Sequence, residues 1–287
     1  MAKDKINEKG RESMVNYHAH TFRCRHATGA EEKYLERAIE NGVTHFGFSD
    51  HAPFVFPDGY ESTFRVPMNL RFEYMETLGK LREKFKGKIH VFIGFEMEYL
   101  PDYFDEMLKT VNEAGAEYLI LGQHFLGNEH PEMFRVSQGS DDESLLAAYI
   151  DQVIEGMETG VFSYLAHPDM FHFTGDEKLL ESYDRKLCRA AVRLGLPLEI
   201  NLLGIRSQRC YPRESFWRIA AEEGVEVVIG FDAHERRAAY DEKSIAVAME
   251  LIERYGLKYN PYPTLIDPRT KQPRDMKYDG IDSTKKA

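Results

Sequence analysis

Cysteine, tryptophan and long apolar runs are scarce in this sequence, and each scarcity excludes a class of protein. The chain of 287 residues has one tryptophan and three cysteines, Cys24, Cys188 and Cys210, with no C-x-x-C pair. This odd, widely spaced set argues against a disulfide scaffold and favours a reduced, cytoplasmic compartment. No stretch approaches the ~18 apolar residues of a membrane span. The polar start MAKDKINEKGRES lacks the apolar core of a secretory signal.

Basic residues are outnumbered by acidic ones. Lys and Arg together number 37 against 48 for Asp and Glu, which gives a net charge of −11. An acidic surface repels polyanions, so nucleic acid is not an expected partner. A small anionic substrate would need a locally positive pocket. The sequence also lacks G-x-S-x-G, H-E-x-x-H and G-x-x-x-x-G-K-[ST] motifs, which disfavours the enzyme classes that carry them.

Short apolar runs alternate with longer helical patterns along the chain. The runs are mostly β-branched or aromatic, as expected for buried parallel strands. They cover residues 15–19, 44–48, 89–95, 118–121, 162–166, 198–202 and 225–231. Seven such units predict an α/β fold, namely a distorted (β/α)7 barrel with its active site at the carboxyl ends of the strands. An open, doubly wound sheet is the competing architecture.

Seven helices are expected between and after these strands. Their apolar residues recur at spacings of three and four, within 31–41, 70–85, 103–114, 145–157, 179–194, 215–221 and 245–255. The first is expected to open with a Thr28-x-x-Glu31 capping box and to stop at Gly42. We expect one domain over residues 1–287 with a core of about 14–260, because no linker composition interrupts the pattern. The tail after Pro261 is rich in Pro, Lys and Asp and is expected to be irregular or mobile.

The histidines and two acidic residues fall in register with the strand ends. His18 and His20, like Glu96 and Glu98, stand two apart and therefore share a face. The other strand-end positions are held by His51, His124, His167, Asp232 and His234. Chemistry collects at the carboxyl ends of parallel strands, so this set predicts one site. His45, His90, His130 and His172 lie elsewhere in the pattern and are read as ordinary core or loop residues.

Clustered imidazoles and carboxylates are costly to bury without a partner, and divalent cations are the natural partner for this mixture. His26, in the loop FRCRHA, brings the set to seven histidines with Glu96 and Asp232. Nine ligands exceed the roughly three protein ligands of one catalytic zinc. We therefore expect two or three ions that share a carboxylate bridge, with Glu96 as the bridge. The ligand types accept Zn²⁺, Mn²⁺ or Fe²⁺.

Six segments resemble the metal motifs of the PHP (polymerase and histidinol phosphatase) superfamily. They are YHAHTFRCRHA, SDHAP, GFEMEY, LGQHF, LAHPD and GFDAH, in the family's order between residues 17 and 235. The segments GFEMEYLPD and LEINLLGIR are similar to the histidinol-phosphatase branch in particular. The resemblance implies a distorted (β/α)7 barrel with a trinuclear metal centre. Gln123, which precedes His124, departs from many family members without removing a ligand.

The resemblance also implies how the nine ligands divide among three ions. His18, His20, Glu96 and Asp232 would hold the first, Glu96, His124 and His167 the second, and His26, His51 and His234 the third. The implied reaction is hydrolysis of L-histidinol phosphate to L-histidinol and phosphate, in histidine biosynthesis, by attack of a metal-bridging hydroxide on phosphorus. Three dications would also supply the positive pocket that an acidic chain needs for an anionic substrate.

Several residues near the strand ends are candidates for substrate contact or proton transfer. Arginine forks suit phosphate oxygens, and Arg206 and Arg23 are the first choices, with Arg25 and Arg209 as alternatives. Asp232, with His234 beside it, is the expected acid or base, since an alkoxide leaving group needs a proton. Asn201 is a candidate hydrogen-bond donor to substrate, and Glu98 is a candidate partner for a cationic substrate group. Asp50 and Asp169 adjoin ligand histidines and are candidates to orient them.

Three other functions remain open at this point. Another PHP phosphoesterase would act on phosphotyrosine, a nucleotide or a sugar phosphate. An amidohydrolase also uses an HxH on its first strand, but many place a bridging lysine where this chain has Gln123 and His124. A non-catalytic PHP domain would be expected to have lost ligands, whereas all nine positions are filled here.

Overall fold

The computed structural model describes residues 14–130 and 133–274. The polar start of the chain and the end of its tail lie outside the described residues. The strands form two parallel sheets. The first has the order β1 (Met14–Asn16), β2 (Val43–His51), β3 (His90–Met97) and β4 (Leu119–Leu121), and the second has the order β5 (Leu198–Asn201), β6 (Glu226–Gly230) and β7 (Lys258–Tyr259).

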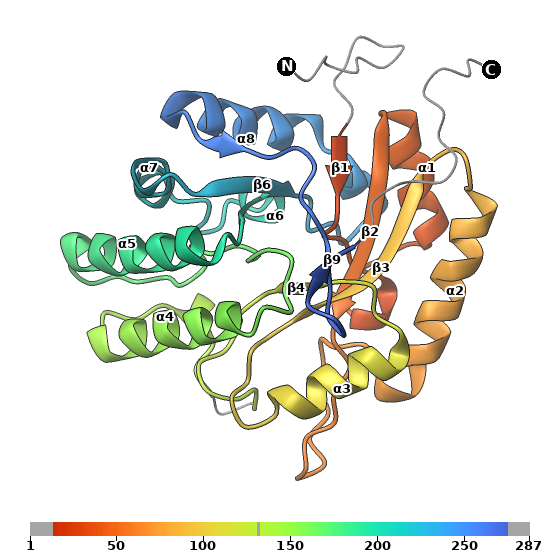
Figure 1. The fold of residues 1–287 in the computed structure, drawn as a ribbon, viewed down its shortest axis with the longest axis horizontal. Coiled ribbons are helices and arrows are strands. Elements are labelled where there is room, and N and C mark those ends of the chain that lie inside the picture. Colours follow the sequence, from red (N-terminus) through yellow and green to blue (C-terminus); the bar gives the residue numbers. More distant parts are fainter. Residues whose placement is uncertain (1–13, 131–132, 275–287) are drawn as a thin grey trace.

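Single-residue bridges join the two sheets into a barrel. Leu165 pairs in parallel with Leu121 on one side and with Leu198 on the other. Ala19, beyond the end of β1, pairs in parallel with Ala233, beyond the end of β6. The strand positions therefore close on themselves in a curled, TIM-like arrangement (Figure 1), which confirms the distorted (β/α)7 barrel and excludes the open sheet.

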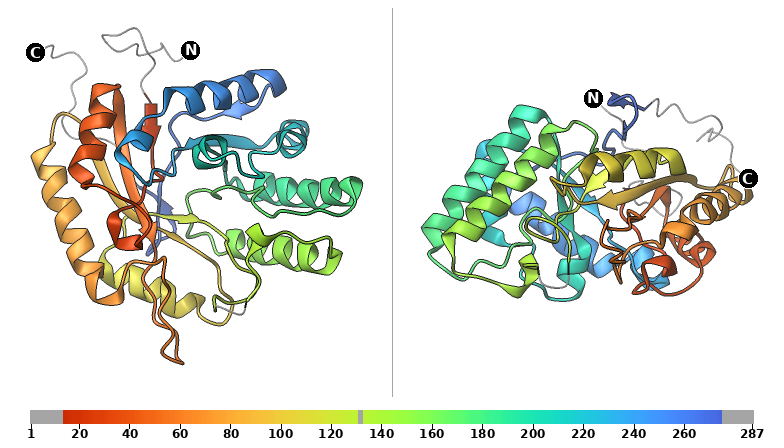
Figure 2. Two further views of the ribbon diagram at one scale, coloured as in Figure 1. Left: turned by 180° about the vertical axis from the view of Figure 1, so that it is seen from behind. Right: turned by 90° about the horizontal axis from the view of Figure 1, so that it is seen from below.

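Helices surround the strands, and the two further views show this layer from behind and from below (Figure 2). Their bounds are α1 Glu31–Glu40, α2 Arg71–Lys84, α3 Phe104–Ala114, α4 Glu143–Glu158, α5 Glu177–Leu194, α6 Leu202–Arg206, α7 Glu214–Glu223 and α8 Glu242–Tyr255. All seven predicted helices are present, and the short α6 was not predicted. One-turn 3₁₀ helices η1 to η4 lie at Phe22–Cys24, Met68–Leu70, Val136–Gln138 and Arg236–Ala239.

Three local predictions were wrong. Residues 162–166 form no strand, because the segment pairs only through the bridges at Leu165 and then turns at His167, whose φ is 32°. Thr28 does not cap α1: Ala30 is the N-cap, without a side-chain bond, and the Thr28 amide donates to His234 O instead. The chain after Pro261 was expected to be irregular or mobile, but its described residues, up to 274, include a short hairpin of β8 (Ile266–Asp267) and β9 (Gln272–Pro273).

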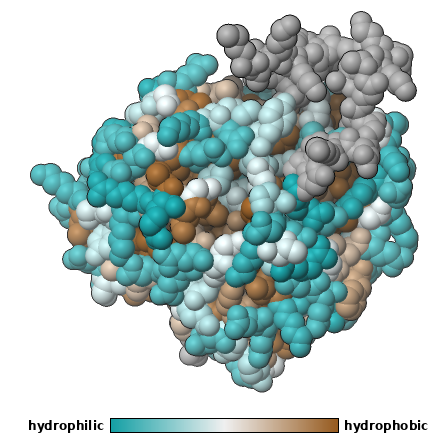
Figure 3. All heavy atoms as spheres, viewed as in Figure 1, coloured by the Kyte–Doolittle hydropathy of each residue, from teal (hydrophilic) through white to brown (hydrophobic). Residues whose placement is uncertain are grey.

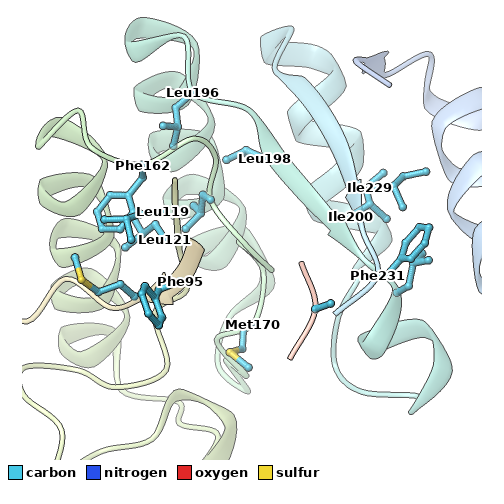
Figure 4. Packing of buried hydrophobic residues seen from close by; sticks show 14 of the residues in the cluster. Phe95, Leu119, Leu121, Phe162, Met170, Leu196, Leu198, Ile200, Ile229 and Phe231 are labelled. Atoms are coloured by element: carbon cyan, nitrogen blue, oxygen red, sulfur yellow. The ribbon is translucent and has the colours of Figure 1, made fainter. Parts of the chain in front are cut away.

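The core has two layers because successive strand residues point to opposite faces. Residues that face outward, such as Phe95, Leu121 and Ile200, pack beneath the helices (Figure 4). Residues that face inward fill the barrel in a separate cluster of Val15, Tyr17, Tyr118, Ile120, Tyr164, Ala166, Val228 and Leu265. The inward face of each strand then continues toward its carboxyl end with polar side chains.

The outer face in Figure 3 is mostly hydrophilic, with hydrophobic patches interrupted by polar residues. Among the described residues, no helix combines the length and the apolar character needed to cross a bilayer.

Candidate active site

The carboxyl ends of the strands surround a cavity of about 600 Å³. Eight of the nine predicted metal ligands line it, namely His20, His26, His51, Glu96, His124, His167, Asp232 and His234. The ninth, His18, is fully buried beneath them, with its Nε2 3.2 Å from Nε2 of His20. The structure therefore brings together all nine side chains, which come from positions up to 216 residues apart (18 to 234).

Glu96, the next-to-last residue of β3, lies at the centre of the cluster. Its Oε1 is 2.9 Å from His167 Nε2 and 3.6 Å from His124 Nε2. Its Oε2 faces the other side, 3.2 Å from Nδ1 of His51 and 3.4 Å from Nε2 of both His18 and His20. Because its two oxygens face different groups of imidazoles, this carboxylate has the position of a bridge between cations.

Space for Glu96 is provided by a neighbouring strand end. A Cβ added to Gly122, just after β4, would lie 1.9 Å from Glu96 Oε1, so no larger residue fits without displacing the carboxylate. Gly230 plays the same part for Glu199, whose Oε1 would be 1.6 Å from an added Cβ. Both glycines thus leave room for a buried carboxylate inside the barrel.

Asp232 approaches the same imidazoles from the end of β6. Its Oδ1 is 3.3 Å from His20 Nε2, 3.6 Å from His18 Nε2 and 3.2 Å from His234 Nδ1. The imidazole of His234 stacks on that of His20, with ring centroids 4.1 Å apart. Donor atoms lie within 4.8 Å of one another in the group of His26, His51 and His234, and also in the group of His51, Glu96 and His124.

The backbone is strained at two of these residues. His167 and Asp232 have φ values of 32° and 46°, in the left-handed region that only a few per cent of residues other than glycine adopt. Such conformations cost on the order of 1–3 kcal/mol each and cluster at functional sites. Here the turn directs each side chain back over the mouth of the barrel.

The residues present fit divalent cations. His51 Nδ1, His167 Nδ1 and Asp232 Oδ1 are buried without a hydrogen-bond partner, although buried polar atoms are normally paired. Lone pairs that converge in this way are satisfied by a cation, and imidazole nitrogens with carboxylate oxygens are the donors that divalent transition metals accept.

The charge states of the cluster agree with this interpretation. Burial raises the pKa of Glu96, but His51, His124 and His18 outweigh it and hold that pKa well below its ordinary value. Burial lowers the pKa of His26 to about 4, so its ring is neutral near pH 7. Burial also lowers the pKa of His18, but Glu199, Asp232 and Glu96 raise it to about 10 overall. A bound cation would displace such a proton, since ligand imidazoles must be neutral.

A second layer of acceptors fixes the orientation of the imidazoles. Glu199 Oε1 lies 2.8 Å from His18 Nδ1, and Glu98 Oε1 lies 2.8 Å from His124 Nδ1. Asp50 Oδ1 lies 3.4 Å from His20 Nδ1, a contact in the place where the sequence predicted one. Each acceptor holds a proton on Nδ1 and leaves Nε2 toward the centre, as acceptors behind metal-bound histidines do.

Asp169 does not orient an imidazole as predicted. Its Oδ2 accepts from the backbone amide of Arg213 at 2.6 Å, so the carboxylate fixes the loop before α7. Glu199 was missed by the sequence reasoning. The signal that could have identified it is a carboxylate inside the strand LEIN, between two apolar residues and on the same face as Asn201.

The predicted substrate residues occupy different surroundings. Arg206, at the end of α6, donates from Nη2 to Phe231 O and Asp232 O, while its buried Nη1 has no hydrogen-bond partner. It lines a smaller cavity, about 440 Å³, to which His26 and His234 also contribute. Asn201 is buried and donates to Glu199 Oε2 and Asp232 Oδ2, so it supports the cluster from below.

Two of the predictions are not favoured by the structure. The Arg23 guanidinium is buried against Thr21, Glu31 and Glu73 and does not line the cavity, because these partners draw it toward α1 and α2. Glu98 is fully buried between His124 and Arg65 and is inaccessible to a substrate cation. Among the arginines weighed as alternatives, Arg209 lines the main cavity.

The rest of the cavity wall is apolar or aromatic except at Thr63, Arg135, Ser137 and Arg209. Phe64 and Phe125 stack with centroids 5.7 Å apart, and the ring of Phe64 meets that of His51 edge-on at 4.8 Å. Met170, Leu203 and Tyr211 line the opposite parts of the cavity. A ligand could therefore place a polar head on the imidazole cluster and a planar, weakly polar body against these rings.

Comparison with known proteins agrees with this geometry. The model of the PHP domain family matches residues 16–202. A probable histidinol-phosphatase of Deinococcus radiodurans is 28% identical over 227 residues, covering 77% of this chain and 86% of that protein. The histidinol-phosphatase of Bacillus subtilis is 22% identical over 250 residues, covering 76% and 92%.

The fold is also similar to a solved structure. Histidinol phosphate phosphatase from Lactococcus lactis, in a crystal structure with zinc, L-histidinol and phosphate, superposes with a TM-score of 0.69. The two chains share 19% identity, and the match covers 92% of this chain and 99% of the other.

Proposed function

The chain belongs to the PHP domain family, and on that premise we propose that it is a metal-dependent phosphomonoesterase. Its substrate is L-histidinol phosphate, which it hydrolyses to L-histidinol and phosphate in histidine biosynthesis. The observation that carries the proposal is the convergence of nine imidazole and carboxylate side chains at the mouth of one barrel, eight of them lining one cavity. Relatives named histidinol-phosphatase, similar over three quarters of the chain, support the choice of substrate.

The cluster has donors for two to three divalent ions. His18, His20, Glu96 and Asp232 would hold the first, Glu96, His124 and His167 the second, and His26, His51 and His234 the third. Zinc suits this donor set and is the ion in the similar Lactococcus structure, while Mn²⁺ and Fe²⁺ accept the same donors. When bound, such cations supply positive charge for the phosphoryl oxygens and activate water as a nucleophile.

Protein side chains then orient the phosphate and manage protons. Arg206 lines the smaller cavity beside His26 and His234, where its buried, unpartnered Nη1 would have to turn outward to meet a phosphate oxygen, and Arg209 reaches the main cavity. Asp232 Oδ1 faces the cavity without a hydrogen-bond partner, while Asn201 holds Oδ2. Oδ1 is thus placed to accept a proton from water or to pass one to the leaving oxygen, with His234 beside it.

The apolar rings place the organic part of the substrate. Phe64 and Phe125 present flat faces and edges close to His51 and His124. An imidazole ring is planar and would pack against them while its phosphate meets the cluster. The negative net charge of the chain is no obstacle, because bound cations make this mouth locally positive.

A panel of phosphate esters tests the proposal. The values of kcat/KM are compared for histidinol phosphate, phosphotyrosine, a nucleoside monophosphate and a sugar phosphate, with the zinc-loaded protein. We expect histidinol phosphate to exceed the others by at least about 100-fold, the scale on which apolar pockets discriminate between substrates. A higher kcat/KM for another ester would replace the substrate and keep the reaction class. No hydrolysis of any ester would overturn the proposal.

A further inference from the structure

A fully buried arginine joins three of the loops that surround the cavity. Arg65 lies between β2 and η2 and is 1% exposed. Its Nη2 donates to Glu98 Oε2 at 2.5 Å, its Nε to Glu129 Oε2 at 2.6 Å, and its Nη1 to the carbonyl of Ala52 at 3.1 Å. Glu98 follows β3 and Glu129 follows β4, so one guanidinium spans the ends of three neighbouring strands.

The burial of these charges needs an explanation. Glu98 and Glu129 are 0% and 1% exposed, and Arg65 is the positive side chain paired with both. Burying three ionised groups costs several kcal/mol per ion before pairing, and apolar residues of similar volume are often at least as stable. Stability alone is therefore a weak reason for this arrangement.

The second oxygen of Glu98 connects the arginine to the imidazole cluster. Glu98 Oε1 lies 2.8 Å from His124 Nδ1, and His124 Nε2 lies 3.6 Å from Glu96 Oε1. A carboxylate in this place keeps the proton on Nδ1 and leaves the Nε2 lone pair toward the cluster. A carboxylate held on one side by a planar guanidinium fork cannot rotate away from the imidazole.

We propose that Arg65 is a positioning residue that acts through Glu98 to hold His124 in the tautomer and orientation that bind a divalent cation. The same guanidinium anchors the loop that carries Phe64, whose ring lies 4.8 Å from that of His51 and 6.0 Å from that of His124. Arg65 thus ties one metal ligand and one wall of the cavity to a common support. The part of this inference that concerns turnover rests on the proposed function, and the part that concerns cation binding does not.

A double-mutant cycle on zinc affinity tests the proposal. The dissociation constants of Zn²⁺ are measured by competition with a chelator for the wild type, Arg65→Gln, Glu98→Gln and the double variant, all at one pH. We expect the affinity of one Zn²⁺ to fall 10- to 100-fold in each single variant, the scale of losses behind metal-bound histidines. The double variant should bind no more weakly than Glu98→Gln alone, because both changes break the same link. Additive losses would overturn the proposal.

Glu129→Gln is the matched control. Glu129 pairs with the same guanidinium, is equally buried, and makes no hydrogen bond to His124 in the part of the chain that the structure describes. We expect its zinc affinity to stay near that of the wild type while its melting temperature falls about as much as that of Glu98→Gln. Equal losses of zinc affinity in the two variants would show that Arg65 only braces the loops.

A second arginine variant and a kinetic measurement complete the test. If Arg65→Gln does not fold, Arg65→Lys replaces it, because lysine keeps the charge without the fork and should give an intermediate affinity. Where the proposed function holds, Glu98→Gln should lower kcat more than it raises KM at saturating zinc. If the double-mutant cycle on zinc affinity gives the expected result but no phosphate ester is hydrolysed, the proposed function is overturned and the role of Arg65 stands.

Discussion

The strands of this barrel begin among apolar side chains and end among polar side chains, several of which lack hydrogen-bond partners. In the interior of the barrel, Tyr118 just before β4 donates its hydroxyl to the carbonyl of Tyr17 at 2.7 Å, and Leu265 from the C-terminal segment is fully buried in the same cluster. At the carboxyl ends, His51, His167 and Asp232 carry buried atoms without hydrogen-bond partners, and two of these residues have positive φ values.

The difference separates the supports of the fold from those of its chemistry. Apolar packing at the amino end stabilises the barrel, whereas crowded donors at the other end cost free energy until cations bind. Natural proteins accept such local costs at functional sites when the rest of the structure outweighs them. Substitutions at the two ends should therefore change different measured quantities.

The largest effect is expected from Glu96→Gln at the carboxyl end. An amide cannot bridge cations as a carboxylate does, and the cations contribute several kcal/mol to the transition state, so kcat/KM should fall roughly a thousandfold or more. Metal content, kcat/KM and the circular dichroism spectrum check the variant. Retained metal and near-normal turnover would remove the central role that the distances to five histidines give this residue.

Leu265→Ala is expected to have the opposite signature at the amino end. Removing a fully buried leucine should lower the free energy of unfolding by about 2–5 kcal/mol, with zinc affinity unchanged. Denaturant unfolding and zinc titration measure the two quantities. Val247→Ala, at a residue of α8 that is 48% exposed, is the control and should change stability by no more than about 0.5 kcal/mol. Loss of zinc binding in Leu265→Ala would contradict the claim that the two ends of the barrel support stability and metal binding separately.

Arg206→Lys sharpens the comparison within the carboxyl end. A lysine has all its donors on one nitrogen, so it cannot hold the carbonyls of Phe231 and Asp232 with one nitrogen and present another to phosphate as a guanidinium can. Loss of charged hydrogen bonds worth about 1.5–3 kcal/mol should lower kcat/KM roughly 10- to 100-fold. Arg23→Lys should have the smaller effect, since Arg23 points away from the cavity toward Glu31 and Glu73. The reverse order, measured by steady-state kinetics, would restore Arg23 as the phosphate partner.

The smallest effect is expected from Asp267→Asn in the hairpin at the amino end. A hydrogen bond from Arg269 lowers the pKa of Asp267 to about 2. The unfolded value is about 3.9, so the carboxylate stabilises the fold above about pH 4 and this contribution is lost as the pH falls toward 2. The variant should lose less than about 1 kcal/mol near pH 6, because the pair is near the surface. Urea unfolding at several pH values should show the gap between the two proteins closing with acid, and a gap independent of pH would contradict this.

The sequence analysis succeeded where a short-range rule determines the outcome. The period of two places His18 with His20 on one face, and parallel strands bring their ends together, so the metal donors could be predicted without coordinates. The helices followed from their apolar spacing. The strand at 162–166 could not be predicted correctly, because its extent depends on pairing with Leu121 and Leu198.

The positions of the predicted substrate-binding side chains depend on partners that are distant in the sequence. Arg23 is long enough to reach several places, and Glu73, fifty residues away, determines which one it takes. Glu98 lies on the predicted face of its strand, but its carboxylate contacts Arg65 from a neighbouring loop and His124 Nδ1 instead of facing the cavity. No local pattern marks Arg65, since a buried arginine is recognised only by the carboxylates around it.

Removal and return of the cations tests the central claim most directly. The protein is stripped with a chelator, its metal content is measured, and hydrolysis of histidinol phosphate is followed before and after Zn²⁺ or Mn²⁺ is added back. We predict that the stripped protein keeps its barrel, loses turnover, and regains it in proportion to the cations bound. Turnover at the full rate by metal-free protein would contradict the account.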